Sequence, residues 1–255
     1  MELLSYRPKD STSAENAEQM TNSEGVSNTF VYFNFLSAGH TARAILVYMS
    51  ANWTNADFPY SDDWEEKHIT PLGVLPVLKI HTPKIKDIII SEAIVIDFYL
   101  AKKAGLLGNN EWEEQVIKSI YSSAHYLRER FFMRVTYIDQ ESKKRNFSRF
   151  MEFLLPHFIR TMEFHLQDNG ANGFFMGDRL SLADIHVAAV MDHFFLQPMG
   201  EPIRKVLEAS ELLMKVKQSV DNEPRLASWK KTQQYKVLEE ETIQFYAVSA
   251  IIEGA

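Results

Sequence analysis

Two short apolar runs, at residues 77–80 and 88–90, stand out between Pro71 and Gly105. Both are rich in β-branched residues, which is typical of strands. Pro76 precedes the first run, at the first position of the expected strand, where a missing N–H group is tolerated. The pattern predicts two strands joined by a turn.

A helix is predicted directly after the second run. Ser91 is a favourable N-cap residue, and Gly105 supplies a stop. Between them apolar residues recur at helical spacing, at Ile94, Phe98 and Ala101.

The chain before Pro71 predicts an alternation of strands and helices. Residues 1–28 are too poor in apolar side chains to offset the entropy of ordering, so we expect a disordered tail. The elements expected next are a strand at 29–35, a helix at 41–51, a short strand at Phe58 and a short helix at 62–68. The predicted first domain, residues 29–106, therefore has the order β-α-β-α-β-β-α.

After Gly108 the pattern is helical throughout, and we expect an all-helical domain at 111–255. Ser181 and Asp184 have the spacing of a capping box, in which a Ser caps a helix and an acid reaches back. The expected helices are 112–138, 143–166, 202–220, one from 224 onward and one at 239–252.

Composition narrows the classes of function. The 255 residues carry a net charge of −7, which argues against a general nucleic-acid or anionic-membrane surface. Cysteine is absent, which excludes disulfides, thiolate nucleophiles and Cys-ligated zinc. No apolar run approaches the roughly 20 residues of a membrane-spanning helix, and no apolar signal-peptide core is present, so a cytoplasmic location is expected.

The segment Leu75-Pro76-Val77-Leu78, followed by Ser91 at a helix start, resembles the glutathione-binding half of glutathione S-transferases (GSTs). A second segment, Phe174 to His186, resembles the Gly-Phe-Phe-x-Gly…Leu-Thr-Leu-Ala-Asp-x-His region of sigma-class members. The likeness covers roughly residues 29–232. It implies an N-terminal thioredoxin-like domain followed by the all-helical GST C-terminal domain, with glutathione as co-substrate and a homodimeric assembly.

Tyr32 is the main catalytic candidate, because it lies in the first strand where sigma-class members carry a Tyr-Phe pair. In the family this phenol donates a hydrogen bond to the glutathione sulfur and favours its thiolate. Ser37 is the second candidate, because some GST classes use a serine in this loop. From the residues alone, a core tyrosine is the favoured interpretation of Tyr32, because strands favour Tyr, and only the resemblance reverses this. Ser37 is otherwise a loop or N-cap residue.

The resemblance also implies a set of glutathione contacts. A Trp and, four residues later, a basic residue bind the glycyl carboxylate in the family. Leu75 and the expected cis-Pro76 offer main chain to the extended tripeptide, and Ser91 at the helix N-terminus holds the γ-glutamyl carboxylate. The residues that match these positions are Trp64, His68, Leu75, Pro76 and Ser91, and Lys67, one residue before His68, could substitute for it as the basic residue.

Several family positions differ in this chain. Ser37-Ala38 stands where the family has Gly-Arg, Val74 replaces a glutamine, and Ile90 replaces a Gln or Glu. An acid that crosses the dimer in sigma-class proteins falls on Lys118. Each lost polar contact is worth about 0.5–1.5 kcal/mol, so three losses weaken glutathione affinity by about two powers of ten.

Tyr121, His125 and Arg128 lie on a long helix that, in the family, borders the apolar co-substrate. The alternative for at least half of these aromatic-rich positions is an ordinary helical core. His186 and His193, seven residues apart, are expected to be packed or surface residues, and no metal site is expected.

The first hypothesis for function is an enzyme that conjugates reduced glutathione to a small apolar electrophile. A non-catalytic binding or structural protein with the GST fold, as in lens crystallins, is the alternative that the altered contacts favour. A glutathione-dependent isomerase of the prostaglandin-synthase type is a third, which no residue separates from the first.

Overall fold

The structure is a computed structural model that describes residues 24–58, 70–83, 87–136 and 139–251. The chain divides into two compact units, one up to Leu100 and one from Ala101 onward. The first unit is a mixed α/β layer and the second is helical, which confirms the predicted fold class. The expected helix at 62–68 lies outside the described residues.

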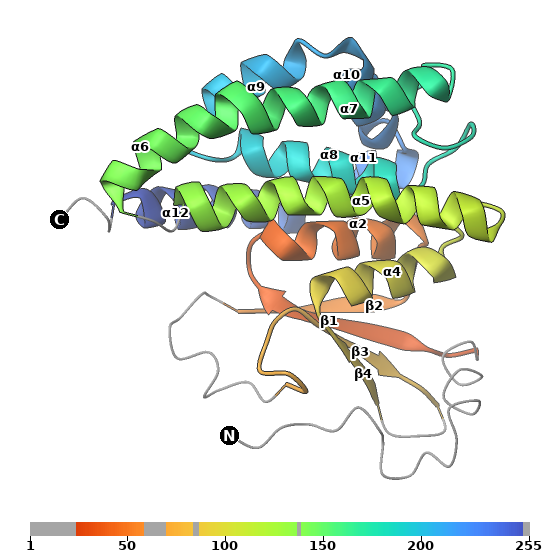
Figure 1. Ribbon diagram of the computed structural model, residues 1–255. Helices are drawn as coiled ribbons and strands as arrows, with labels where there is room; N and C mark the ends of the chain where they lie inside the picture. Colours follow the sequence, from red (N-terminus) through yellow and green to blue (C-terminus); the bar gives the residue numbers. More distant parts are fainter. Residues whose placement is uncertain (1–23, 59–69, 84–86, 137–138, 252–255) are drawn as a thin grey trace. The chain divides into compact units, whose positions relative to one another are not determined.

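The first unit is built on a four-stranded mixed sheet with the order β2-β1-β3-β4 (Figure 1). β1 pairs with β2 in parallel and with β3 antiparallel, and β3 pairs antiparallel with β4. The strands are β1 (Ser27–Phe33), β2 (Trp53–Phe58), β3 (Val77–His81) and β4 (Ile88–Ser91). β1 therefore begins two residues before the expected start at Thr29, inside the stretch that was expected to be disordered.

Two helices, α2 (His40–Tyr48) and α4 (Ala93–Lys103), lie on one face of this sheet (Figure 1). A single 3₁₀ turn, η1 (Ser37–Gly39), leads into α2. The predicted apolar face of α4 is wrong in part, because Ile94 is 38% exposed while Ile96 and Leu100 are buried. Ala101 is fully buried as predicted and Phe98 is half-buried, so only the Ile94 end of the expected stripe differs, where Ile96 takes its place in the core.

The second unit consists of helices that pack around α8, which is buried along almost its whole length. Its α-helices are α5 (Glu111–Phe131), α6 (Gln140–Arg149), α7 (Leu155–Asp168), α8 (Leu182–Phe195), α9 (Gly200–Glu208), α10 (Glu211–Asp221), α11 (Pro224–Lys230) and α12 (Gln233–Ile251). None of the described helices is both long and apolar enough to cross a membrane.

Of the two long helices expected at 112–138 and 143–166, the first passes into a wide turn near its end and the second is interrupted by one. The π-helical segment η2 (Phe132–Thr136) follows α5, and η3 (Phe150–Leu154) joins α6 to α7. A π turn inserts one extra residue into a helix, and such insertions occur frequently at functional sites.

The predicted capping box at the start of α8 is present. The buried Asp184 carboxylate accepts hydrogen bonds from the Ser181 N–H and hydroxyl, both at 2.7 Å, and from the Phe175 N–H at 2.8 Å. Burial raises the pKa of Asp184 to about 6, although these hydrogen bonds act in the opposite direction. The box thereby ties the loop before α8 to the first turn of that helix.

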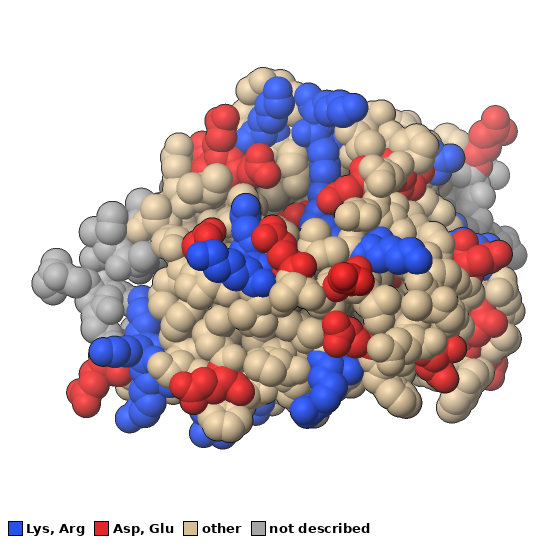
Figure 2. Space-filling view, turned by 90° about the horizontal axis from the view of Figure 1, so that it is seen from above, with Lys and Arg blue, Asp and Glu red and all other residues tan. Residues whose placement is uncertain are grey.

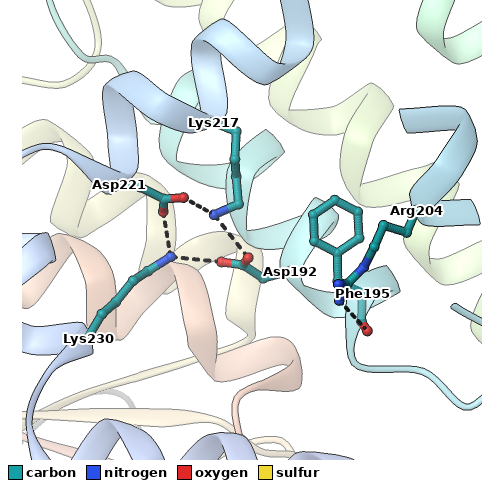
Figure 3. Close-up of polar contacts among 6 residues, drawn as sticks. All are labelled: Asp192, Phe195, Arg204, Lys217, Asp221 and Lys230. Carbon is teal, nitrogen blue, oxygen red and sulfur yellow. Dashed lines mark hydrogen bonds and ion pairs between the residues drawn. The ribbon is translucent and has the colours of Figure 1, made fainter. Parts of the chain in front are cut away.

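A closed ring of four charges joins α8, α10 and α11 (Figure 3). The Asp192 carboxylate lies 3.0 Å from the ammonium groups of both Lys217 and Lys230. Asp221 contacts the same two lysines, at 2.6 Å from Lys230. Each charge therefore has two partners of opposite sign, which offsets the cost of removing it from water.

Candidate functional site

The strand register brings three of the candidate residues to one end of the sheet. Val31 pairs with Val77, and Val77 pairs with Ser91, in one row across β1, β3 and β4. Tyr32 is one residue beyond this row, so continuing the register puts it beside Pro76. Strand alternation points the Tyr32 side chain to the opposite face from Val31, so the residues converge at the end of the sheet rather than on one face.

Tyr32 lies in an aromatic cluster. Its ring centroid is 5.3 Å from that of Phe33 and 5.5 Å from that of Phe35, and the residue is 6% exposed. Gly39 packs against the same ring, because a Cβ atom there would lie 2.7 Å from Tyr32 Cδ1. The phenol is therefore held in a fixed orientation by packing on several sides.

Arg43 is a component of this region that the sequence reasoning missed. The side chain is fully buried and donates to the carbonyl oxygens of Phe35 at 2.8 Å and Phe33 at 3.0 Å. It also pairs with Asp57 at 2.6 Å and bonds Asn55 at 3.2 Å. The signal was a lone arginine within the apolar run of α2, on the face that packs against the sheet.

The two charges of the Arg43–Asp57 pair are both affected by burial. Burial lowers the pKa of Arg43, and Asp57 acts against that change. Burial likewise raises the pKa of Asp57, while Arg43 acts to lower it. The guanidinium also lies 5.6 Å from the centroid of the Tyr32 ring, so Arg43 contacts both this ring and the backbone that follows it.

Ser37 begins the 3₁₀ turn between β1 and α2, with a φ angle of +29°. Residues other than glycine adopt positive φ at a cost of about 1–3 kcal/mol, and such strain clusters at functional sites. Its position after the aromatic residues of β1 keeps Ser37 as the alternative hydroxyl to Tyr32.

The Ser91 hydroxyl is buried and finds no hydrogen-bond partner among the described residues. The predicted N-cap role of Ser91 is wrong, because the chain turns at Glu92, with φ of +77°, and α4 begins at Ala93. The first helical hydrogen bond of α4 runs from Ile96 N–H to the Glu92 carbonyl. Ser91 is therefore a buried polar group in a position where such groups are normally paired.

The segment before β3 contributes backbone rather than side chains. The Leu75–Pro76 peptide bond is cis, as the resemblance implied. Thr70 Oγ1 accepts a hydrogen bond of 3.0 Å from Val74 N–H, which closes the turn that leads to Leu75. Trp64, Lys67 and His68, the other candidates for glutathione contacts, lie outside the described residues.

Tyr121, His125 and Arg128 lie on α5 in the helical unit. Tyr121 is 1% exposed, and its ring centroid lies 3.9 Å from that of His186 and 5.9 Å from that of His125. His186 and His193 are both buried, which confirms that they are packed residues. The first two candidates thus meet in a stacked cluster with His186, and their role in a co-substrate pocket stays a prediction.

Burial and the neighbouring Arg128 together lower the pKa of His125 to about 4, so this imidazole is neutral at physiological pH. Burial alone would lower the pKa of Arg128, but Glu129 at 2.8 Å, together with Tyr246 and Tyr121, outweighs it and the net shift is upward. Over the described ranges, no group of three or more His, Asp or Glu side chains is arranged to hold a metal ion.

Comparison with known proteins agrees with this architecture. The family model "Glutathione S-transferase, C-terminal domain" matches residues 125–233. A glutathione S-transferase of Anopheles gambiae is 22% identical over 75% of this chain and 90% of its own length. S-crystallin 4 of Enteroctopus dofleini is also 22% identical, over 80% of this chain and 95% of its own.

Among solved structures, a Fasciola hepatica sigma class GST superposes with a TM-score of 0.70 at 20% identity, covering 81% of this chain and 96% of that one. The fold, the family model over residues 125–233 and relatives that span both units all lead to one conclusion: the chain is similar over most of its length to members of the glutathione S-transferase family.

Proposed function

We propose that the chain binds reduced glutathione at the end of the sheet formed by β1, β3 and β4, and transfers its thiolate to a small apolar electrophile. The observation that carries this proposal is the buried Ser91 hydroxyl, which lacks a partner among the described residues and lies in one row with Val77 and Val31. A ligand carboxylate would supply the missing partner.

The dimensions of this edge suit a tripeptide. Neighbouring strands are about 4.8 Å apart, so β1 and β4 are separated by roughly 10 Å across β3. An extended tripeptide is also roughly 10 Å long. Leu75 forms no hydrogen bond with other described residues, so its main chain remains able to pair with such a ligand.

Tyr32 would supply the chemistry. A free thiol has a pKa near 8.5 and is mostly protonated at neutral pH. One hydrogen bond from a phenol to a thiolate, worth about 1.5–3 kcal/mol, lowers that pKa by about one to two units. The thiolate would then form a bond to the electrophilic carbon, a leaving group such as halide would depart with the bonding electrons, and the thiol proton would pass to solvent.

The binding step is tested by calorimetry of the full chain with reduced glutathione. Ser91→Ala is expected to weaken binding by about tenfold or more, because it removes a hydrogen bond to a charged group. The exposed Ser119→Ala on α5 is the matched control and is expected to bind as the wild type does. Equal affinity in both variants would remove Ser91 from the site.

The chemical step is tested by the pH dependence of conjugation to an aryl halide. Tyr32→Phe is expected to lower the rate by about 10–100-fold near pH 6.5 and by little above pH 9.5, where the thiol ionises unaided. Tyr126→Phe, at an exposed tyrosine, is the control. A rate that depends on Ser37→Ala and not on Tyr32→Phe would transfer the role to Ser37.

The second candidate function is a non-catalytic binding or structural protein. It is favoured by the similarity to S-crystallin 4 and by the substitutions at Ala38, Val74 and Ile90. Calorimetry separates the candidates, because this function predicts no heat and no thermal shift with millimolar glutathione. The thiolate step would equally serve a glutathione-dependent isomerase, so the assays include a lipid endoperoxide.

A cytosolic homodimer is the assembly and location that we propose from the family resemblance. Sedimentation of the purified chain over a concentration series tests the dimer, with a concentration-independent monomer as the contrary result.

A further inference from the structure

A cavity of about 130 Å³ lies in the helical unit where α5 passes into η2 and α6 passes into η3. Three arginines line it: Arg130 from α5, Arg134 from η2 and Arg149 from α6. The apolar part of its wall is formed by Val135, Phe150 and Leu154. It therefore combines a concentration of positive charge with an apolar surface.

The cavity coincides with the two π-helical segments. η2 contributes Arg134 and Val135 to the wall, and η3 contributes Phe150 and Leu154. Each π turn widens its helix by one residue, so it redirects the side chains of that turn. Both π turns in this part of the described chain therefore contribute residues to the same cavity. π turns occur frequently at functional sites.

The three arginines have unused hydrogen-bonding capacity. Within the described residues, Arg130, Arg134 and Arg149 form no ion pair, whereas the nearby Arg128 is paired with Glu129. Arg130 is oriented by the ring of Tyr126, with its guanidinium carbon 4.5 Å from the ring centroid. Each guanidinium has five N–H donors in a geometry that matches a phosphate or carboxylate.

The local charge is opposite to that of the whole chain. Residues 128–154 contain seven Lys and Arg against four Asp and Glu, while the full chain has a net charge of −7. Figure 2 shows Lys and Arg side chains at the left end of the face in view, with some Asp and Glu beside them, and further Lys and Arg elsewhere on that face. Mutual repulsion among the three arginines is relieved by a bound anion, which makes binding of one favourable.

The backbone of the cavity is also fixed. The Asn146 side-chain amide donates a hydrogen bond of 2.9 Å to the carbonyl oxygen of Arg134, which links α6 to η2. This bond holds the two sides of the cavity together, so little ordering entropy would be lost on binding.

We propose that this cavity is a binding site for a small amphipathic anion of the phosphate monoester type. The dianionic phosphate would be held by the guanidinium groups of Arg130, Arg134 and Arg149. A short apolar group would lie against Val135, Phe150 and Leu154. The volume equals that of roughly four water molecules in the liquid, enough for such a head group and part of its substituent.

The test uses the full chain and phenyl phosphate as the probe, with inorganic phosphate and phenol as its two halves. Calorimetry at low salt is expected to show phenyl phosphate binding at least tenfold more tightly than inorganic phosphate, and phenol binding not at all up to 10 mM. Saturating glutathione is expected to leave the affinity unchanged, so this result is independent of the proposed function.

Four variants locate the site. Arg134→Gln and Arg149→Gln, at exposed residues, are each expected to weaken phenyl phosphate about tenfold or more. Arg160→Gln, at an exposed arginine of α7 outside the cavity, is expected to have no effect. Leu154→Ala is expected to weaken phenyl phosphate about threefold to tenfold and leave inorganic phosphate unchanged, because only the apolar wall is shortened.

The proposal is overturned by either of two results. One is an absence of phenyl phosphate binding at 10 mM by a chain that is folded by circular dichroism. The other is an equal loss in Arg160→Gln and Arg149→Gln, which would indicate general electrostatic attraction rather than a site.

Discussion

At the scale of single residues, Arg43 determines the geometry around the candidate catalytic tyrosine. Its guanidinium bonds the carbonyl groups of Phe33 and Phe35, one and three residues after Tyr32 in the chain. It also ties β2 to α2 through Asp57, whose side chain is 20% exposed. The buried guanidinium thus supplies hydrogen bonds to backbone carbonyl groups at and beyond Phe33, where the strand pairing of β1 ends.

Replacing Arg43 with methionine is expected to cost about 3–5 kcal/mol of unfolding free energy, because Asp57 and two backbone carbonyls lose their donor. Arg43→Lys keeps the charge but not the fork of donors, so it is expected to recover only part of the loss. Urea unfolding of the two variants measures both values. A cost below about 1 kcal/mol for Arg43→Met would contradict this role.

The candidate residues differ in how far their sequence could define them. Tyr32, Pro76 and Ser91 were identifiable because local spacing and resemblance marked them. The sequence could not show that the Ser91 hydroxyl lacks a partner among the described residues, because this depends on the turn of the backbone at Glu92. The spacing instead suggested an N-cap, which α4 does not use at this residue.

At the scale of elements, the capping box of α8 fixes the start of the most buried helix. Asp184 accepts three hydrogen bonds while it is fully buried. Burial nevertheless raises its pKa to about 6, above the ordinary value of 3.8. The folded chain therefore binds more protons than the unfolded chain between about pH 4 and pH 6.

Because of that difference, the contribution of Asp184 to stability falls as the pH rises through this window. We expect the stability advantage of the wild type over Asp184→Asn to be about 2 kcal/mol larger at pH 4.5 than at pH 7.5. Guanidinium unfolding at the two pH values measures it. An advantage that grows with pH would mean that the hydrogen bonds outweigh burial and lower the pKa of Asp184.

The long helices show a different limit of sequence reasoning. The spacing of apolar residues located α5, α6 and α7 approximately, because these helices are amphipathic and each has one apolar stripe. It did not reveal η2 and η3, because one inserted residue changes the phase of the stripe by about one position. The cavity between them was invisible for the same reason, although all three arginines were present in the sequence.

At the scale of the whole molecule, the ring of Asp192, Lys217, Asp221 and Lys230 connects three helices of the C-terminal unit (Figure 3). The side chains of Asp192 and Lys217 are 16% and 7% exposed, so their charges are largely removed from water. The pKa of Lys230 is raised: burial alone would lower it, but Asp192, Tyr235 and Asp221 together outweigh that effect.

Asp192→Asn is expected to destabilise the chain by about 3–5 kcal/mol, because it leaves two lysines partly buried with one carboxylate between them. The matched control is Glu201→Gln, which breaks the exposed Glu201–Lys205 pair and is expected to cost less than about 1 kcal/mol. Thermal unfolding of both variants measures the difference. Equal effects would show that burial does not strengthen the ring.

The sequence by itself determined the class of each unit, the order of the strands and helices along the chain, and the capping box. These depend on periodicity and on residues close together in the chain. Only the tertiary structure decided what depends on residues far apart. It brought Tyr32, Pro76 and Ser91 to one end of the sheet, buried Arg43 against Asp57, and left three arginines around a cavity without an acidic partner within the described residues. Which charges are paired and which are buried depends on how distant segments pack together, and the spacing of residues along the chain does not show this.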